Sequence, residues 1–152
     1  MHIDYMNKCN KDVMEKVLII SSNFLPESVG GASRIYEMAK EIQKEYDVSV
    51  ICPPPTYPFA KYKKSKHIFQ KQILDGITVY RIWTYQPSTS NPSFLGRFLY
   101  YMIFPILTNL FLFRLLHNTS FVIISTPPSS LLITSWMVRL FRKKLIVDVR
   151  DL

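Results

Sequence analysis

Two stretches of the sequence carry residue types that bind anions, and the first is a glycine turn. In "KVLIISSNFLPESVGGASRIYEMAKEI", Gly30 and Gly31 stand side by side between an apolar run and an amphipathic pattern. A helix begins with backbone N–H groups that lack partners, and its dipole places partial positive charge there. Without two side chains in the way, a diphosphate can approach those donors closely. Arg34 adds a charged donor in the first turn, so all three are candidate anion-binding residues.

The second stretch, "LIVDVRDL", follows an apolar run with Asp148, Arg150 and Asp151. An open α/β sheet binds ligands beyond the carboxyl ends of its strands. The fork of donors on an arginine suits sugar hydroxyls or a phosphate. Thr126, in "ISTPPS", is expected to line the same cleft, and Tyr57, in "PPPTYP", is a candidate contact for an acceptor.

Each candidate also has an ordinary structural explanation. The two glycines can simply form a tight turn into a helix that Ser33 caps. Asp148 and Arg150 can pair to close a strand end, Thr126 can belong to a plain turn, and Tyr57 can pack on the surface. The glycines alone do not decide between a ligand and a turn.

The elements that must position these residues alternate along the chain. Apolar runs predict strands over residues 16–22, 47–52, 121–126 and 145–152, and an alternating pattern predicts another from Gly76. Helical spacing follows the glycines, and a turn and a helix are expected between residues 127 and 144. We therefore predict an α/β fold: an open, mainly parallel Rossmann-like sheet with helices on both faces. It forms one domain over residues 16–152, after a loosely ordered leader over residues 1–15.

Composition narrows the classes of partner and site. The formal net charge of +8 points to anionic partners. The sequence carries no helix-turn-helix, zinc or single-strand-binding signature, so we expect no nucleic acid. Cys9 and Cys52 stand far apart without nearby histidines, which predicts neither a metal site nor a disulfide. The dinucleotide fingerprint and the phosphate-loop lysine are both absent.

An uncharged segment and a basic segment suggest membrane contact. Residues 98–113, "FLYYMIFPILTNLFLF", are flanked by arginines, fall short of a spanning helix and contain Pro105 and Asn109 as interruptions. We expect a helix lying at a bilayer surface, with the basic stretch from Lys61 to Lys71 meeting anionic headgroups. The alternatives are a solvated basic face and an apolar helix that is core or an interface with a further lobe.

The ordered set of motifs resembles a known family. "KVLIISSNFLPESVGGASRIYEMAKEI", "GITVYRIWTY", "ISTPPS" and "LIVDVRDL" occur in the order and spacing of the amino-terminal domain of family 4 glycosyltransferases, most like those that build surface polysaccharides and glycans. The resemblance covers Lys16 to Leu152. It implies one lobe of the two-lobed GT-B architecture, the lobe that receives the acceptor. The second lobe of that family binds the nucleotide-sugar donor, and transfer retains anomeric configuration, generally without a metal or other cofactor.

The resemblance also implies roles for the candidate residues. Gly30 and Gly31 are expected beside the donor phosphates, and Arg150 and Asp151 at the reacting centre, where many relatives have a histidine in place of Arg150. The sequence departs from the pattern because it lacks the tryptophan and proline that usually follow "RDL" and the donor-binding lobe. We expect an acceptor-side half that is inactive without a donor-binding lobe, acting on a glycan or lipid-linked acceptor at the cytoplasmic membrane face. The alternative is a non-catalytic membrane-docking or binding subunit that recruits a partner enzyme.

Overall fold

A six-stranded sheet forms the centre of the molecule. The computed structural model describes residues 14–58, 61–87 and 93–150, so most of the predicted leader lies outside it. The strand order is β3-β4-β2-β1-β5-β6, and β3 alone runs antiparallel to its neighbour. The strands are β1 (Lys16–Ile20), β2 (Asp47–Cys52), β3 (Phe69–Leu74), β4 (Ile77–Ile82), β5 (Phe121–Ser125) and β6 (Lys144–Asp148). The predicted open, mainly parallel sheet is confirmed.

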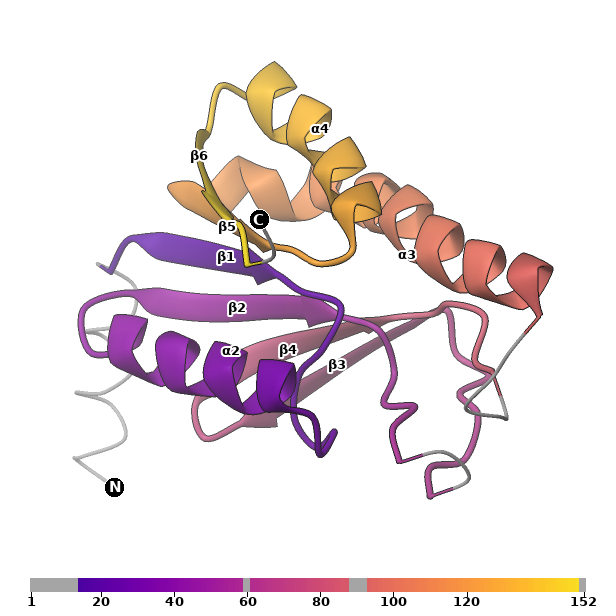
Figure 1. Ribbon diagram of the computed structural model, residues 1–152. Coiled ribbons are helices and arrows are strands. Elements are labelled where there is room, and N and C mark those ends of the chain that lie inside the picture. The colour runs from indigo at the N-terminus through magenta and orange to yellow at the C-terminus, as the bar shows by residue number, and fades with distance from the viewer. Residues whose placement is uncertain (1–13, 59–60, 88–92, 151–152) are drawn as a thin grey trace.

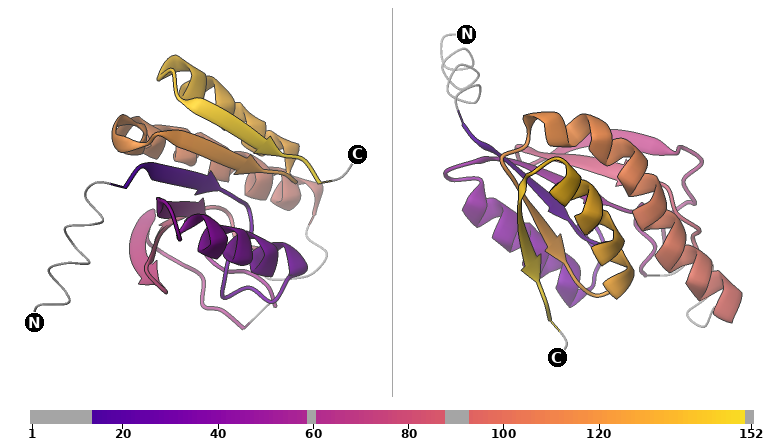
Figure 2. Two further views of the ribbon diagram at one scale, coloured as in Figure 1. Left: turned by 90° about the vertical axis from the view of Figure 1, so that its left-hand side faces the viewer. Right: turned by 90° about the horizontal axis from the view of Figure 1, so that it is seen from above.

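Helices cover both faces of this sheet, as the sequence predicts (Figures 1 and 2). Helix α2 (Gly30–Ile42) lies on one face. The other face carries α3 (Phe94–Leu115), α4 (Ser135–Leu140) and the short 3₁₀ helices η1 (Leu116–Asn118) and η2 (Ser129–Thr134). The expected helix between residues 127 and 144 is therefore a 3₁₀ turn followed by a short α-helix.

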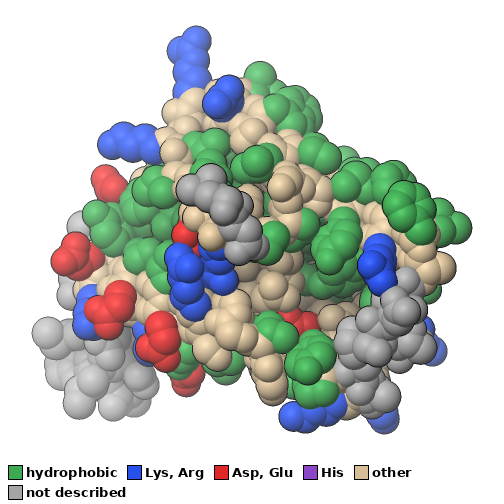
Figure 3. All heavy atoms as spheres, viewed as in Figure 1, with side chains coloured by type: hydrophobic (Ala, Val, Ile, Leu, Met, Phe, Trp, Pro, Cys, Tyr) green, Lys and Arg blue, Asp and Glu red, His purple; other side chains and the backbone are tan. Residues whose placement is uncertain are grey.

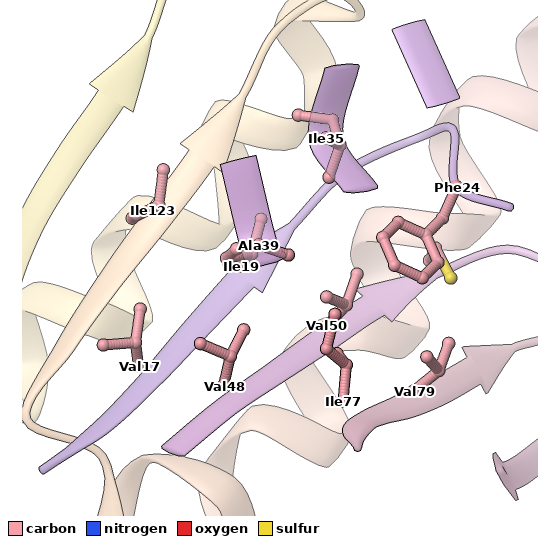
Figure 4. Packing of buried hydrophobic residues seen from close by; sticks show 11 residues of the cluster. Val17, Ile19, Phe24, Ile35, Ala39, Val48, Val50, Ile77, Val79 and Ile123 are labelled. Atoms are coloured by element: carbon pink, nitrogen blue, oxygen red, sulfur yellow. The ribbon is translucent and has the colours of Figure 1, made fainter. Parts of the chain in front are cut away.

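Strand β1 shows why its sequence is a continuous apolar run. Val17 and Ile19 pack on the face that α2 covers (Figure 4). Leu18 and Ile20 pack on the opposite face with α3, because successive side chains of a strand point to opposite faces. Full burial of such a side chain contributes about 1.5–3 kcal/mol. If β1 shifted by one residue relative to its neighbours, the side chains that face α2 and those that face α3 would change places. Burial on both faces therefore fixes the register of this strand.

Helix α3 continues through Pro105, one of the two residues that interrupt the apolar run in the sequence. Proline has no N–H to give to the carbonyl of Tyr101, four residues earlier. The hydroxyl of Ser130, in η2, donates to that carbonyl at 2.8 Å. The Asn109 side chain in turn donates to the carbonyl of Pro105 at 3.1 Å. Side-chain donors thus satisfy carbonyls around the proline, and the helix does not end there.

The basic stretch from Lys61 to Lys71 ends in β3, an edge strand that the sequence pattern did not predict. Asp75 and Gly76 turn the chain into β4 with φ angles of 48° and 83°. Both angles lie in the left-handed region that Asp-Gly favours in two-residue hairpin turns. "DG" was therefore the sequence signal for this hairpin, and it was missed.

Candidate functional site

The amino terminus of α2 has no side-chain cap. Its N-cap is Val29, in extended conformation, and Ser33 lies inside the first turn, so the alternative in which Ser33 caps the helix is wrong. The Ala32 N–H donates to the Val29 carbonyl at 2.9 Å. In the part of the chain that the structure describes, the N–H groups of Gly30 and Gly31 have no hydrogen-bond acceptor. Two donors with partial positive charge are therefore open to a ligand.

The two glycines differ in their surroundings. A Cβ on Gly30 would meet nothing within 4 Å, so nothing in the described structure requires glycine there. A Cβ on Gly31 would lie 3.3 Å from Nη1 of Arg150 and 3.5 Å from Nδ2 of Asn23. The absence of a side chain at Gly31 is what lets the guanidinium lie against the helix terminus. Of the two glycines predicted to contact a ligand, Gly31 is therefore the one that another side chain, that of Arg150, approaches closely.

Asp148 joins the two predicted stretches into one cluster. Its Oδ1 accepts from Nη2 of Arg34 at 2.8 Å. Its Oδ2 accepts from the Ser125 hydroxyl at 3.0 Å and from Nε of Arg150 at 3.4 Å. Ser125 and Asp148 are register partners at the carboxyl ends of β5 and β6. The sheet edge therefore brings Gly31, Arg34, Asp148 and Arg150 together, as the sequence analysis expects of strand ends.

The cluster carries an excess of positive charge and a free donor. Among the described residues, the guanidinium groups of Arg34 and Arg150 face one carboxylate, that of Asp148, which leaves one net positive charge. Nη2 of Arg150 is buried and has no hydrogen-bond partner in the described part of the chain. An unpaired buried donor is costly unless a ligand satisfies it. An anion seated between this nitrogen and the α2 N–H groups would satisfy both.

Thr126 and the loop after β1 support this edge through backbone contacts. The Thr126 N–H and hydroxyl both donate to the Asp148 carbonyl, at 2.9 and 3.2 Å. Thr126 thus extends the pairing of β5 with β6, which favours the turn explanation over a ligand contact. The Ser22 hydroxyl donates to the Pro127 carbonyl at 2.9 Å and accepts from the Asn23 amide at 3.2 Å. These contacts place Asn23 beside Gly31.

Tyr57 belongs to a neighbouring loop that a buried carboxylate holds. Oε1 of Glu27, whose residue is 3% exposed, accepts from the N–H groups of Thr56 and Tyr57 at 2.7 and 3.2 Å. It also accepts from the Thr56 hydroxyl at 3.1 Å. Tyr57 itself is 42% exposed. Asp151, the other predicted residue of the reacting centre, lies outside the described residues.

Sequence reasoning missed Asn23, Ser125 and Glu27. The first two directly follow or end buried strands, and polar residues at that position were the available signal. Glu27 gave no signal, because an isolated glutamate in a loop is ordinarily exposed. Its burial follows from the amide donors of a loop about thirty residues later in the chain.

A second candidate surface covers α3 and α4. Side chains of these helices that are apolar and more than half exposed are Phe94, Leu95, Phe98, Ile106, Leu110, Phe113, Trp136 and Leu140. Figure 3 shows hydrophobic side chains gathered over this region, with basic side chains at the margin near α4. The segment Phe94–Asn118 is long and apolar enough to cross a membrane by length and composition, although 33% of its most apolar window is buried in the protein. The helix is thus longer than the uncharged run, and it lies against the sheet.

Comparison with known proteins bears on the fold. No protein-family model matches the sequence, and no curated protein matches it. The structure is similar to the C-terminal domain of a hydrogenase from Pyrococcus furiosus, with a TM-score of 0.55 and 18% identity over 88% of this chain and 91% of that one. At this identity the likeness concerns the fold alone, an open α/β sheet.

Proposed function

We propose that the chain is the acceptor-side half of a retaining glycosyltransferase. It would act with a nucleotide-sugar donor on a glycan or lipid-linked acceptor, at the cytoplasmic face of the membrane. One observation carries the proposal: the uncapped terminus of α2, bare at Gly31, lies against a guanidinium that has a free donor. This arrangement suits the diphosphate of a nucleotide sugar, the anion that such an enzyme must hold.

The cluster can perform the electrostatic part of glycosyl transfer. As the bond between sugar and diphosphate breaks, negative charge grows on the leaving oxygen. The Gly30 and Gly31 N–H groups and Arg150 would stabilise that charge, since fixed donors aimed at developing charge need no reorganisation. Asp148 holds the guanidinium groups of Arg34 and Arg150 in place. We assign recognition of the nucleotide to a donor-binding lobe and expect no transfer without that lobe.

A transfer assay with a matched arginine variant tests this proposal. The chain is co-expressed with the donor-binding lobe of a family 4 glycosyltransferase, and membranes receive radiolabelled nucleotide sugars. We expect label in glycan or lipid-linked product, its loss in Arg150→Ala and its retention in Arg139→Ala, an exposed arginine of α4. Failure of every nucleotide sugar to label a product, or equal activity of the two variants, would contradict the proposal.

The alternative function, a non-catalytic membrane-docking or binding subunit that recruits a partner enzyme, has its own supporting observation. Ile106, Leu110 and Phe113 are 54%, 70% and 65% exposed on one side of α3, and Arg114 follows them. An apolar helix face with basic neighbours suits an anionic bilayer. Serine at all three positions should abolish co-sedimentation with anionic vesicles. If vesicles are still bound, the surface is not the docking face.

A further inference from the structure

A second basic recess lies at the same sheet edge, outside the cluster around Asp148. It has a volume of about 480 Å³ and opens between the loop after β2 and the strands β3 and β4. Its polar lining includes Lys63, Lys64, Lys66, Gln70, Gln72 and Arg81. None of the lining residues is acidic. The volume is within the range of small-molecule sites, and the lining selects against cations.

Arg81, a buried guanidinium, contributes to the wall of this recess. The residue is 3% exposed and lies opposite Gln70 in the β3–β4 hairpin. Its Nη1 donates to the Pro53 carbonyl at 3.1 Å and to Sγ of Cys52 at 3.2 Å, and its Nη2 donates to the Leu25 carbonyl. Arg81 thereby ties together the loops that follow β1 and β2.

All these acceptors are neutral, so the buried charge of Arg81 is not balanced in its contacts. With its amide oxygen turned toward Arg81, Gln72 accepts from Nε at 3.2 Å and Nη2 at 3.1 Å, and it is neutral as well. Within the described residues, Arg81 forms no ion pair with a carboxylate. The buried carboxylate of Glu27 lies in the same region, but it accepts from Thr56 and Tyr57 and not from Arg81. A buried cation whose direct contacts are all neutral favours an anion within reach of its guanidinium.

The rim of the recess adds three exposed ammonium groups, those of Lys63, Lys64 and Lys66. A recess whose walls carry one sign of charge focuses the field and concentrates counter-ions. Lysine ammonium groups bind phosphate as point charges, in any orientation around its oxygens. The side-chain amides of Gln70 and Gln72 can donate hydrogen bonds to the same group.

We infer that this recess binds a phosphate or diphosphate group, either free or at the head of a lipid-linked saccharide. This inference deepens the proposed function and rests on it for the identity of the ligand as the acceptor. Pro26, in the connection between β1 and α2, lines the recess, and Gly30 and Gly31 begin the helix into which this connection leads. Donor phosphates at α2 and an acceptor phosphate in the recess would therefore both lie next to this connection.

The binding test uses pyrophosphate, with a variant that removes the other anion site. In a Gly31→Leu chain, amide NMR shifts are followed during titration with pyrophosphate. We expect shifts confined to residues 63–67, 72 and 81. Replacing Lys63, Lys64 and Lys66 with alanine should weaken this binding by roughly ten- to a hundredfold.

A matched triple variant controls for net charge, with alanine at Lys40, Lys44 and Lys144, which lie outside the recess. It should bind pyrophosphate as the parent does. Equal weakening in both triple variants, or shifts spread over other basic surfaces, would overturn the inference. Arg81 is left unchanged because its hydrogen bonds hold two loops, so its removal would report on folding.

Vesicles distinguish the two sources of the phosphate. Neutral vesicles with and without a polyprenyl diphosphate are offered to the chain and to its recess triple variant. Binding that needs both the diphosphate lipid and the lysines identifies a lipid-linked ligand, whereas pyrophosphate binding without vesicle binding identifies a free one. If the parent chain binds neither pyrophosphate nor the vesicles with the diphosphate lipid, the site is refuted. Glycosyl transfer that is equal in the parent and the recess variant, in a chain whose recess binds neither pyrophosphate nor the diphosphate lipid, would leave the proposed function standing and refute this inference alone.

Discussion

Replacement of Gly31 with leucine separates the ligand explanation of the α2 terminus from the turn explanation. The Cβ alone would lie 3.3 Å from Nη1 of Arg150, closer than most Cβ contacts, so the guanidinium must move. The Asn23 amide, 3.5 Å away, closes the other side. The remaining carbons of the leucine must then occupy space at the helix terminus, where the proposed phosphate would be bound.

The expected effects on stability and binding differ in size. Loss of a glycine from the first turn of a helix stabilises it by up to about 1 kcal/mol, and strain at Arg150 offsets a similar amount. The free energy of unfolding should therefore change by less than about 1 kcal/mol. A hydrogen bond between charged groups contributes about 1.5–3 kcal/mol, so loss of the Arg150 contact should weaken diphosphate binding at α2 by roughly ten- to a hundredfold.

The matched control is Gly30→Leu, because a Cβ at Gly30 meets nothing within 4 Å. Urea unfolding measures stability in both variants. UDP titration, followed through the amide shifts of residues 31–35, measures binding at the terminus of α2. We expect Gly30→Leu to keep binding within about threefold of the parent, which is less than 1 kcal/mol. If Gly31→Leu also keeps it, the bare glycine merely makes a turn and the phosphate role is refuted.

Two further predictions concern buried groups. Burial raises the pKa of the Cys52 thiol from 9.0 to about 12, so a Cys9→Ser chain should resist a thiolate reagent at pH 8 until urea unfolds it. Rapid modification of the folded chain would contradict the burial of this thiol. Because the thiol ionises at lower pH in the unfolded chain than in the folded one, the free energy of unfolding should fall as pH rises from about 9 toward 12. The Cys52→Ala variant should not show this part of the fall. Glu27→Ala should lower the free energy of unfolding by roughly 2–4 kcal/mol in urea, since it removes three hydrogen bonds that Thr56 and Tyr57 donate to the carboxylate, and Glu27→Gln by less. Parent-like stability of the alanine variant would show that Glu27 does not hold the loop.

The sequence predicts the central strands well because burial on both faces leaves little choice of residue. Val17 to Ile20 must be apolar throughout, and no helix of ordinary length fits so short a run. Strand β3 could not be predicted in this way, because it is an exposed edge strand whose sequence contains a lysine and two glutamines and so forms no apolar run. The hydrogen bond that replaces the one missing at Pro105 was not predictable either, because its donor is the hydroxyl of Ser130, which belongs to another element.

The sequence predicted which residues would gather in the candidate site. The alternation of apolar strands and amphipathic helices implies a parallel sheet, and parallel strands end at one edge. This edge brings together Gly31, Arg34, Asp148 and Arg150. Which glycine lies at the close approach was not predictable. That distinction depends on the direction of one side chain, that of Arg150, and no spacing in the sequence encodes it.

Both basic features depend on the connection between β1 and α2. Its Leu25 carbonyl accepts from Arg81 beside the recess, its Glu27 carboxylate holds the loop after β2, and it leads into α2, where the Gly31 N–H has no acceptor among the described residues. A shift of this segment would therefore be felt at both anion sites, because each has a wall that contacts it or continues from it. If phosphate in the recess favours one position of the segment, it must also change affinity at α2, and linkage requires the reverse effect to be of equal size. Pyrophosphate can also compete with UDP at α2, in the parent and in the recess triple variant alike. Linkage therefore appears as a difference between the two chains: at one pyrophosphate concentration, the apparent affinity for UDP at residues 31–35 should differ between the parent and the triple variant, and equal affinities would contradict it.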